Sequence, residues 1–197
     1  MGQYSNYPNG FAHGVTIRGI PLQQAQPGQV FWVGNSTVKM PNQKTASNGN
    51  DGTFLAPFST LDYAIGRCTA HRGDIIFVKP GHAETYSNAT SLNLDVAGVA
   101  IIGLGHGSKR PTFTLDTATT ATVPVTAADI TIQNCIFTAN FADIVSVFTL
   151  VAAKYFTLDN CYFKATATDM NFKGIVDTGT VAQDAAGLYI SNCKWIE

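Results

Sequence analysis

Charged residues are scarce in this chain. Of its 197 residues, 13% are Asp, Glu, Lys or Arg, and the formal net charge is −1 at pH 7. Protein domains average ~25% charged residues. Nucleic acids and anionic membranes attract proteins through clustered positive charge, and this balance gives neither partner an electrostatic attraction. We therefore expect a protein that binds neither nucleic acid nor a membrane.

Long apolar runs are missing as well. The longest, 96–104, is far shorter than the roughly 20 residues that a membrane-spanning helix needs. The first ten residues are polar, without the basic start and apolar centre of a secretory signal peptide. From these two absences we expect a protein made in the cytoplasm.

Residues that carry chemistry are few and scattered. The four Cys form no CxxC pair and the four His show no HxH spacing, so neither a zinc nor a redox motif is indicated. The stretch GLGHG lacks the Lys-Ser/Thr that closes a phosphate-binding loop. Polysaccharide hydrolysis would need paired acids, and no Asp-x-Asp pair occurs among Asp95, Asp116, Asp129, Asp159 and Asp177. We expect no catalytic residue, no cofactor and no metal, and a protein that is not an enzyme.

The chain does contain a repeat. Three segments alternate apolar and polar residues and then continue with Asn-Cys and an aromatic two places beyond the Cys: DITIQNCIF (129–137), YFTLDNCYF (155–163) and GLYISNCKW (187–195). A fourth, VAIIGLG (99–105), has Gly103 in the place of the Asn. A self-similar unit of about 30 residues is the signature of a solenoid.

Each repeat predicts a strand, a one-residue corner and a second strand. The alternation indicates strands with one buried face, and Asn and Gly are the residues that tolerate a left-handed corner. The chain is therefore predicted to be all-β, a right-handed parallel β-helix of about four three-stranded coils. Three unrelated strands sharing Asn-Cys by coincidence are disfavoured by the common register.

Stacked coils would align the repeated residues in two structural ladders. The asparagine side chains could then hydrogen-bond from coil to coil, and the cysteines would fill the interior as small, reduced thiols. Neighbouring cysteines could in principle form a bridge, although three in a ladder leave one over. The predicted ladder residues are Asn134, Asn160, Asn192, Cys135, Cys161 and Cys193.

The sequence predicts two regions in the chain. Residues 1–48 carry too little apolar content for a core of their own, so we expect an extended arm that packs on the solenoid, a sister subunit or another protein; the alternative is a flexible tail. Residues 49–197 form the β-helix domain, with a helix near 59–67 that Ser59 or Thr60 caps and that closes one end. The residues expected to contact a partner are Tyr4, Tyr7, Phe11, Arg18, Phe31 and Trp32.

Several segments resemble known proteins. GNDGTFLAPFSTLDYAI (49–65), GDIIFVKPGHAETY (73–86) and VAIIGLG (99–105) resemble the opening of the pectate-lyase-like right-handed β-helix superfamily. NYPNGFAHGVTIRGIPL (6–22) and VFWV (30–33) look like the start of tailed-phage virion structural proteins. Those proteins include capsid-decorating (cement) proteins and tail spikes built on this fold.

The resemblance and the scarcity of candidate catalytic or metal-binding residues suggest a structural role. We expect a phage capsid decoration protein that binds the outer surface of the assembled head as a homotrimer and stabilises it. Its partners would be the major capsid protein and its own copies, and its location the capsid surface of the virion. The alternative is a tail-spike or receptor-binding module that binds or cleaves a surface polysaccharide.

Overall fold

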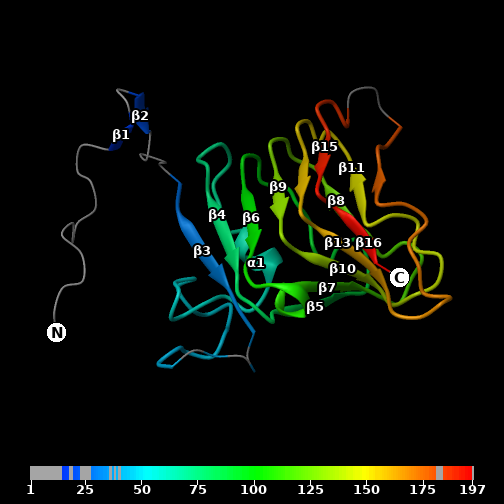
Figure 1. The fold of residues 1–197 in the computed structure, drawn as a ribbon, viewed down its shortest axis with the longest axis horizontal. Helices are drawn as coiled ribbons and strands as arrows, with labels where there is room; N and C mark the ends of the chain where they lie inside the picture. Colours follow the sequence, from blue (N-terminus) through cyan, green and yellow to red (C-terminus); the bar gives the residue numbers. More distant parts are fainter. Residues whose placement is uncertain are drawn as a thin grey trace.

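The protein is a parallel β-solenoid of about four turns with very little helix (Figure 1). The computed structural model describes residues 15–17, 20–22, 28–35, 37, 39, 41–180 and 184–196, with the backbone alone for 15–17 and 20–22. Its strands stack in register along one axis, and strands of successive coils pair within the same sheet. This confirms the predicted all-β parallel β-helix.

The longest sheet has six parallel strands in the order β15-β12-β9-β6-β4-β3. From β4 onward, neighbours in this sheet are separated in sequence by strands of the other sheets, because the chain completes one circuit of the solenoid between them. The strands are β3 (Val30–Val33), β4 (Ile75–Val78), β6 (Ala100–Gly103), β9 (Thr131–Gln133), β12 (Thr157–Asp159) and β15 (Tyr189–Ser191).

Two further parallel sheets close the solenoid. The five-stranded sheet has the order β16-β13-β10-β7-β5 and the three-stranded sheet the order β14-β11-β8. The first contains β5 (Ala83–Tyr86), β7 (Thr112–Leu115), β10 (Ile136–Ala139), β13 (Tyr162–Ala165) and β16 (Lys194–Ile196). The second contains β8 (Val123–Val125), β11 (Phe148–Leu150) and β14 (Val176–Asp177).

One short helix packs on the first coil. Helix α1 (Leu61–Ile65) begins after Thr60, whose side chain accepts a hydrogen bond from the Tyr63 N–H at 3.4 Å. Its buried side chains face β3 and β4, so it covers the apolar end of the stack near residues 59–67, where a helix was predicted. The other short elements are the 3₁₀ helix η1 (Gly107–Lys109) and an antiparallel pair, β1 (Val15–Ile17) with β2 (Ile20–Leu22).

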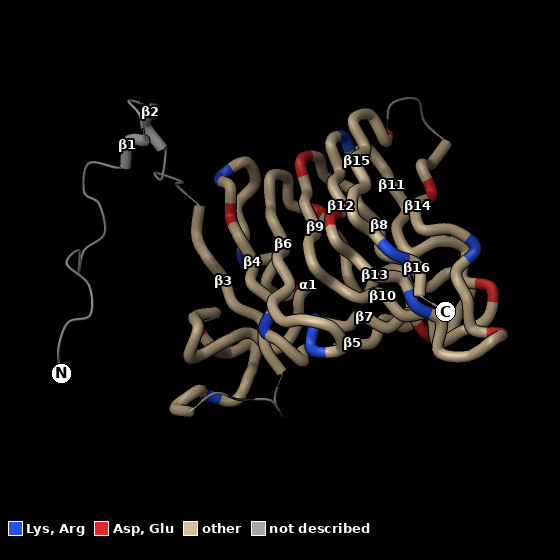
Figure 2. The backbone as a smooth tube through the Cα atoms, in the orientation of Figure 1, with Lys and Arg blue, Asp and Glu red and all other residues tan. Residues whose placement is uncertain are grey.

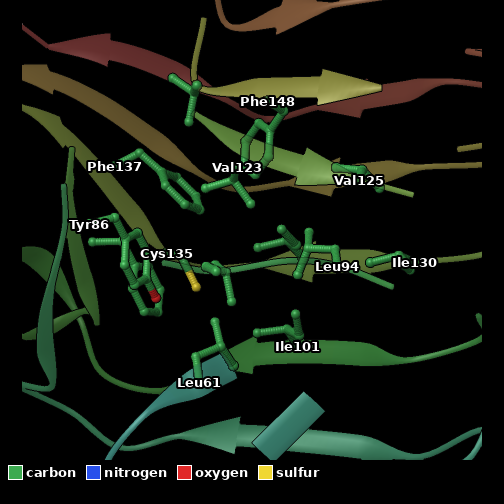
Figure 3. Packing of buried hydrophobic residues seen from close by; sticks show 14 of the residues in the cluster. Leu61, Tyr86, Leu94, Ile101, Val123, Val125, Ile130, Cys135, Phe137 and Phe148 are labelled. Carbon is green, nitrogen blue, oxygen red and sulfur yellow. The ribbon is translucent and has the colours of Figure 1, made fainter. Parts of the chain in front are cut away.

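The core is a set of stacked side-chain rows inside the solenoid. Ile101, Val123 and Phe137 come from three different sheets and point into the same interior (Figure 3). The rings of Phe113 and Phe137 stack at 5.6 Å between centroids, and those of Phe137 and Phe163 at 5.9 Å. Complete burial of such side chains contributes about 1.5–3 kcal/mol each, and the inward rows therefore hold the coils together.

Asparagine corners separate the six-stranded from the five-stranded sheet. Asn134, Asn160 and Asn192 have φ of 60°, 52° and 53°, the left-handed region. The Asn160 amide donates to Asn134 Oδ1 at 3.1 Å, and the Asn134 amide donates to the Gly103 carbonyl at 2.7 Å. Asn192 donates instead to Asp159 Oδ1 at 2.9 Å, so a carboxylate serves as its acceptor.

Gly103 occupies the aligned position in β6 for a different reason from the one predicted. It is not among the glycines with a positive φ, whereas Gly105 has φ 104°. A Cβ on Gly103 would lie 2.4 Å from the Asn134 carbonyl oxygen and 3.0 Å from Cys135 Sγ. The close approach of the next coil therefore requires glycine here, and the expected left-handed corner at this position is wrong.

The four cysteines are all free thiols. Cys135 and Cys161 are buried, whereas Cys193 in the last coil is half-buried. Cys161 Sγ lies 3.7 Å from the Ile132 carbonyl oxygen, and Cys193 Sγ lies 3.8 Å from that of Leu158. Each of these two thiols thus rests against the coil before its own.

The solenoid begins earlier than the predicted boundary at residue 48. Strand β3 pairs in parallel with β4 over its whole length, from Val30↔Ile75 to Val33↔Val78. Its edge is covered by the following loop, since Trp32 N–H donates to the Gly52 carbonyl and the Phe58 N–H donates to the Trp32 carbonyl, both at 2.8 Å. Residues 30–33 are therefore a rung of the solenoid and not part of an arm, because their inward side chains complete its first coil.

Candidate binding faces

The outer face of the six-stranded sheet is apolar where β3, β4 and β6 build it. Alternate residues of these strands point outward, and the register aligns them in two rows. All keep part of their side chains exposed, up to 48% for Val30. These six residues, called the apolar face below, are Val30, Ile75 and Ala100 in one row and Trp32, Phe77 and Ile102 in the other.

Trp32 is the centre of an aromatic cluster on this face. Its ring lies 4.9 Å from that of Phe77 and 4.8 Å, edge to face, from that of Phe54. Phe54 and its neighbour Leu55 remain 40% and 48% exposed, so the loop after β3 extends the apolar face. Rigid, partly exposed aromatic clusters of this kind are what binding hot spots are made of.

A buried lysine lies beneath this cluster. Lys79 is 5% exposed, and its Nζ donates to Gln43 Oε1 at 2.6 Å and to the Phe54 carbonyl. The ammonium lies 4.1 Å from the centre of the Phe54 ring. Burial lowers the Lys79 pKa. Lys79 therefore links the loop that contains Phe54 to the sheet, and its buried charge does not add to the surface of the apolar face.

The same sheet becomes polar at β9, β12 and β15. The Asp159 carboxylate accepts hydrogen bonds from Gln133 Nε2 at 2.8 Å, Ser191 Oγ at 2.7 Å and Asn192 Nδ2 at 2.9 Å. These bonds, the Ser191 one first, lower the Asp159 pKa. The outward rows here consist of Thr131, Thr157 and Tyr189, and of Gln133, Asp159 and Ser191.

The outer face of the five-stranded sheet is basic at its far end. Outward positions of β13 and β16 hold Tyr162, Lys164 and Lys194, and both lysines are exposed. No outward position of the five strands carries a carboxylate. Figure 2 marks the cation positions near β13 and β16, while β3 and β6 are uncharged along their length. With Arg110, these residues form what we call the basic face.

Arg110 fixes the Tyr162 ring of this face. Its guanidinium lies 3.9 Å from the ring centre and donates to the Asn160 carbonyl at 3.0 Å and to Asn160 Oδ1 at 3.3 Å. Arg110 is 8% exposed, whereas Lys194 approaches the same ring to 5.8 Å from an exposed position. The aromatic ring is thus held between a buried and an exposed cation.

A pocket of about 490 Å³ at the edge of β5 contains two carboxylates, Asp62 and Glu84. Glu84 accepts hydrogen bonds from the Leu61 N–H at 2.7 Å and the Tyr86 hydroxyl at 3.1 Å, and it pairs with His82 Nε2 at 2.6 Å. Its oxygens are therefore engaged in holding the start of α1 against the solenoid. Burial, with Glu84 nearby, raises the Tyr86 pKa well above its usual value.

A second pocket, of about 650 Å³, lies between the loop 165–172 and Trp195. Trp195 is aligned with Phe163, so it belongs to the inward aromatic row rather than to an outer face. Its ring meets Phe172 edge to face at 6.1 Å. The pocket therefore exposes an interior position of the stack.

The residues predicted to contact a partner lie in different environments or outside the described part of the chain. Tyr4, Tyr7, Phe11 and Arg18 lie outside the described residues. Trp32 points outward into the apolar face. The position of Phe31 corrects the prediction: its ring is 8% exposed and packs on Phe58 at 5.8 Å, because alternation along β3 turns it inward.

Several candidate residues went unrecognised in the sequence. β4 and β6 read IIFV and AIIG, apolar at inward and outward positions alike. That loss of alternation signalled an apolar outer face for Ile75, Phe77 and Ile102. No comparable signal marked the basic face, because Arg110 and Tyr162 lie far apart in the chain and meet only through the stacking of coils.

The described part of the chain lacks two further features. No helix within it is long and apolar enough to cross a membrane. The same residues contain no group of three or more His, Cys, Asp or Glu arranged to hold a metal ion.

Comparisons with known proteins define the fold class. No protein-family model matches the sequence, and no curated protein matches it. Among solved structures, one named "Rhamnogalacturonan lyase" is similar at a TM-score of 0.50 and 15% sequence identity. The match covers 85% of this chain and 51% of that one, so this chain spans about half the length of the lyase. The likeness shows a shared β-helix fold.

This match corrects one expectation from the sequence. We expected a protein that is not an enzyme, but its architecture is shared with a protein named for cleaving a polysaccharide. Scattered acids are therefore no basis for excluding enzymatic activity. The pectate-lyase-like part of the resemblance agrees with this match in fold.

Proposed function

We propose that the protein attaches to a larger protein shell through the apolar face, as a decoration protein on the outer surface of a phage head. The observation that carries this proposal is the pair of uncharged outward rows on β3, β4 and β6. Contiguous exposed apolar patches are uncommon on isolated soluble proteins and mark interaction surfaces. Strand β3, which begins this face, lies inside residues 1–48, the part of the chain expected to form an arm.

The composition of the apolar face suits a protein partner. Trp32 is partly exposed and held by Phe54 and Phe77, so little side-chain freedom is lost when it is covered. Attachment to assembled subunits, but not to dissociated ones, would stabilise the shell by mass action. The proposed partners are the major capsid protein and two further copies of this chain, as a homotrimer.

Cosedimentation with phage heads that lack the protein tests this function. In Ile102→Lys a cation enters the apolar face beside Phe77, and we expect at least a tenfold loss of affinity, about 1.4 kcal/mol or more. The matched control is Thr157→Lys, at an outward position of the same sheet in its polar half. Equal binding by both variants would overturn the proposal, and a mass measurement in solution checks the trimer.

A second candidate function is binding or cleavage of an acidic polysaccharide on the basic face. The specific observation in its favour is Tyr162, flanked by the Arg110 and Lys194 cations, with Lys164 nearby and no outward carboxylate on the sheet. An aromatic ring offers a platform for a sugar, and the lysines attract acidic groups. The β-helix shared with a rhamnogalacturonan lyase is compatible with this role.

Rhamnogalacturonan is the probe for the second candidate, with a neutral glucan as the control ligand. The double variant Lys164→Glu, Lys194→Glu should lose binding that wild type shows at low salt. Lys154→Glu, which changes an exposed lysine in a turn outside the basic face, should retain it. Fragments that shorten with time in size-exclusion chromatography would establish cleavage. If the double variant binds rhamnogalacturonan as well as wild type does, the basic face is not the binding site.

A further inference from the structure

Two cysteines of neighbouring coils occupy matched positions. Cys161 follows the corner residue Asn160 and Cys193 follows Asn192, and the two corners share the same left-handed backbone, with φ of 52° and 53°. The next residues, Tyr162 and Lys194, are paired in register, and the Lys194 N–H donates to the Cys161 carbonyl at 2.9 Å. Cys161 and Cys193 are therefore direct neighbours along the stack.

This placement is compatible with a disulfide. Adjacent strands of a sheet lie ~4.8 Å apart, which falls inside the Cα separation of about 4.4–6.8 Å found in disulfides. Both thiols are free. Oxidation would join the last two coils at their common corner.

The thiols differ in their readiness to react. Burial raises the pKa of Cys135 and of Cys68 to about 12, which keeps both protonated at neutral pH. Cys193 is half-buried, and a hydrogen bond from the Cys161 thiol lowers its pKa to about 7. Cys161 is buried, and its pKa is raised, first by its bond to Cys193. Cys193, the less buried member of the pair, is thus the better nucleophile, and Cys161 is its buried neighbour.

We propose that Cys193 and Cys161 form a redox modification site that a small-molecule disulfide converts into a disulfide between the last two coils. The Cys193 thiolate attacks one sulfur of the small disulfide, forms a mixed disulfide and releases the first thiolate. Cys161 then gives up its proton, attacks the sulfur of Cys193 and releases the second thiolate. Two protein thiols are oxidised, and one small disulfide is reduced to two thiols.

The consequence is a change in the stability of the last coil. In the reduced protein this coil is held by the pairing of β13 with β16 and of β12 with β15, and its Tyr189 and Ile196 side chains remain exposed. The new bond would close the loop between residues 161 and 193 and restrict its opening. Limited proteolysis within this loop should slow at least severalfold after oxidation.

Oxidised glutathione is the probe, applied to the full chain and followed by mass spectrometry without reductant. Wild type should lose two hydrogens, carry no adduct and yield a cross-linked peptide containing residues 161 and 193. Cys161→Ser should stop at a stable glutathione adduct on Cys193, because the resolving thiol is absent. Cys193→Ser should remain unmodified, and Cys68→Ser should behave as wild type.

Three results would overturn the proposal. One is a wild-type protein that keeps a glutathione adduct on Cys193, since Cys161 would then be unable to reach it. Another is a cross-link that joins Cys135 to Cys161. The third is a wild-type protein that stays fully reduced under conditions that oxidise an unfolded, denatured sample of the same chain.

Discussion

The six-stranded sheet has one constant face and one that changes. On the inner side the aligned residues are aliphatic from coil to coil: Ile76, Ile101, Ile132 and Leu158. On the outer side the neighbouring row passes from Phe77 and Ile102 to Gln133 and Asp159. The two halves of the sheet therefore share a core pattern and differ in what they present outward.

This difference separates the demands of folding from those of binding. The inner row is repeated because every coil must bury the one beside it. The outer row has no such constraint, since β9 and β12 form equally regular strands with polar residues. The apolar residues on β3, β4 and β6 are thus dispensable for the coil itself and available for a partner.

The largest expected effect distinguishes the inner from the outer face. Ile101→Ala removes a fully buried side chain and should lower the free energy of unfolding by about 2–5 kcal/mol. Ile102→Ala, its partly exposed neighbour on the apolar face, should cost less than ~1 kcal/mol. Urea denaturation of the two variants measures both values. Similar losses would mean that the outer row also supports the fold.

The second-largest expected effect is a loss of folding stability at alkaline pH, caused by the buried Cys135 thiol on the inner side of the solenoid. Burial raises the pKa of the Cys135 thiol to about 12 in the folded protein, whereas an unburied cysteine has a pKa of 9.0. The folded protein therefore keeps this proton to a higher pH than the unfolded chain does. The stability contribution is complete below pH 9 and is lost as the pH rises toward 12, by about 1.4 kcal/mol per pH unit. Cys135→Ala should show a shallower decline in denaturation experiments from pH 9 to 11. An unchanged slope would contradict the assignment.

Low pH should reduce the contribution that Asp159, in the polar half of the outer face, makes to the free energy of unfolding. The Asp159 pKa is depressed by its bonds from Ser191, Asn192 and Gln133, so its contribution is present above the unfolded pKa of ~3.9 and disappears as the pH falls through the lower folded value. Asp159→Asn should therefore be less stable than wild type at pH 7 and approach the stability of wild type as the pH falls below the folded-state pKa of Asp159. A difference in the free energy of unfolding between the two proteins that persists at low pH would indicate that the substitution removes packing rather than charge.

The smallest effect on stability should come from extending the apolar face. Thr131→Ile places an aliphatic side chain next to Ala100, in the first coil of the polar half. We expect a change within ~0.5 kcal/mol in the free energy of unfolding, because the position points outward. Fluorescence of a dye that binds apolar surfaces should nevertheless rise. A large change in stability would show that the outer row is not free to vary.

The residue pattern predicted the solenoid because its signals are local. Alternation marks the strands, and a single Asn at each repeat marks a corner that few other residues tolerate. The helix could be located for the same reason, since Thr60 and the apolar spacing after it lie within one short segment. Gly103 was misjudged because its constraint comes from the next coil, through the close approach of the Asn134 carbonyl.

By itself, then, the sequence determined the fold class, the strands, the inward rows and the asparagine corners, all of which depend on neighbours within a few residues. Only the tertiary structure decided which outward residues share a surface. Ile75 and Val30 are aligned across a full circuit of the chain, and Arg110 reaches the Tyr162 ring two coils away. Stacking sets these contacts, because the length of each loop fixes which residue lies above which.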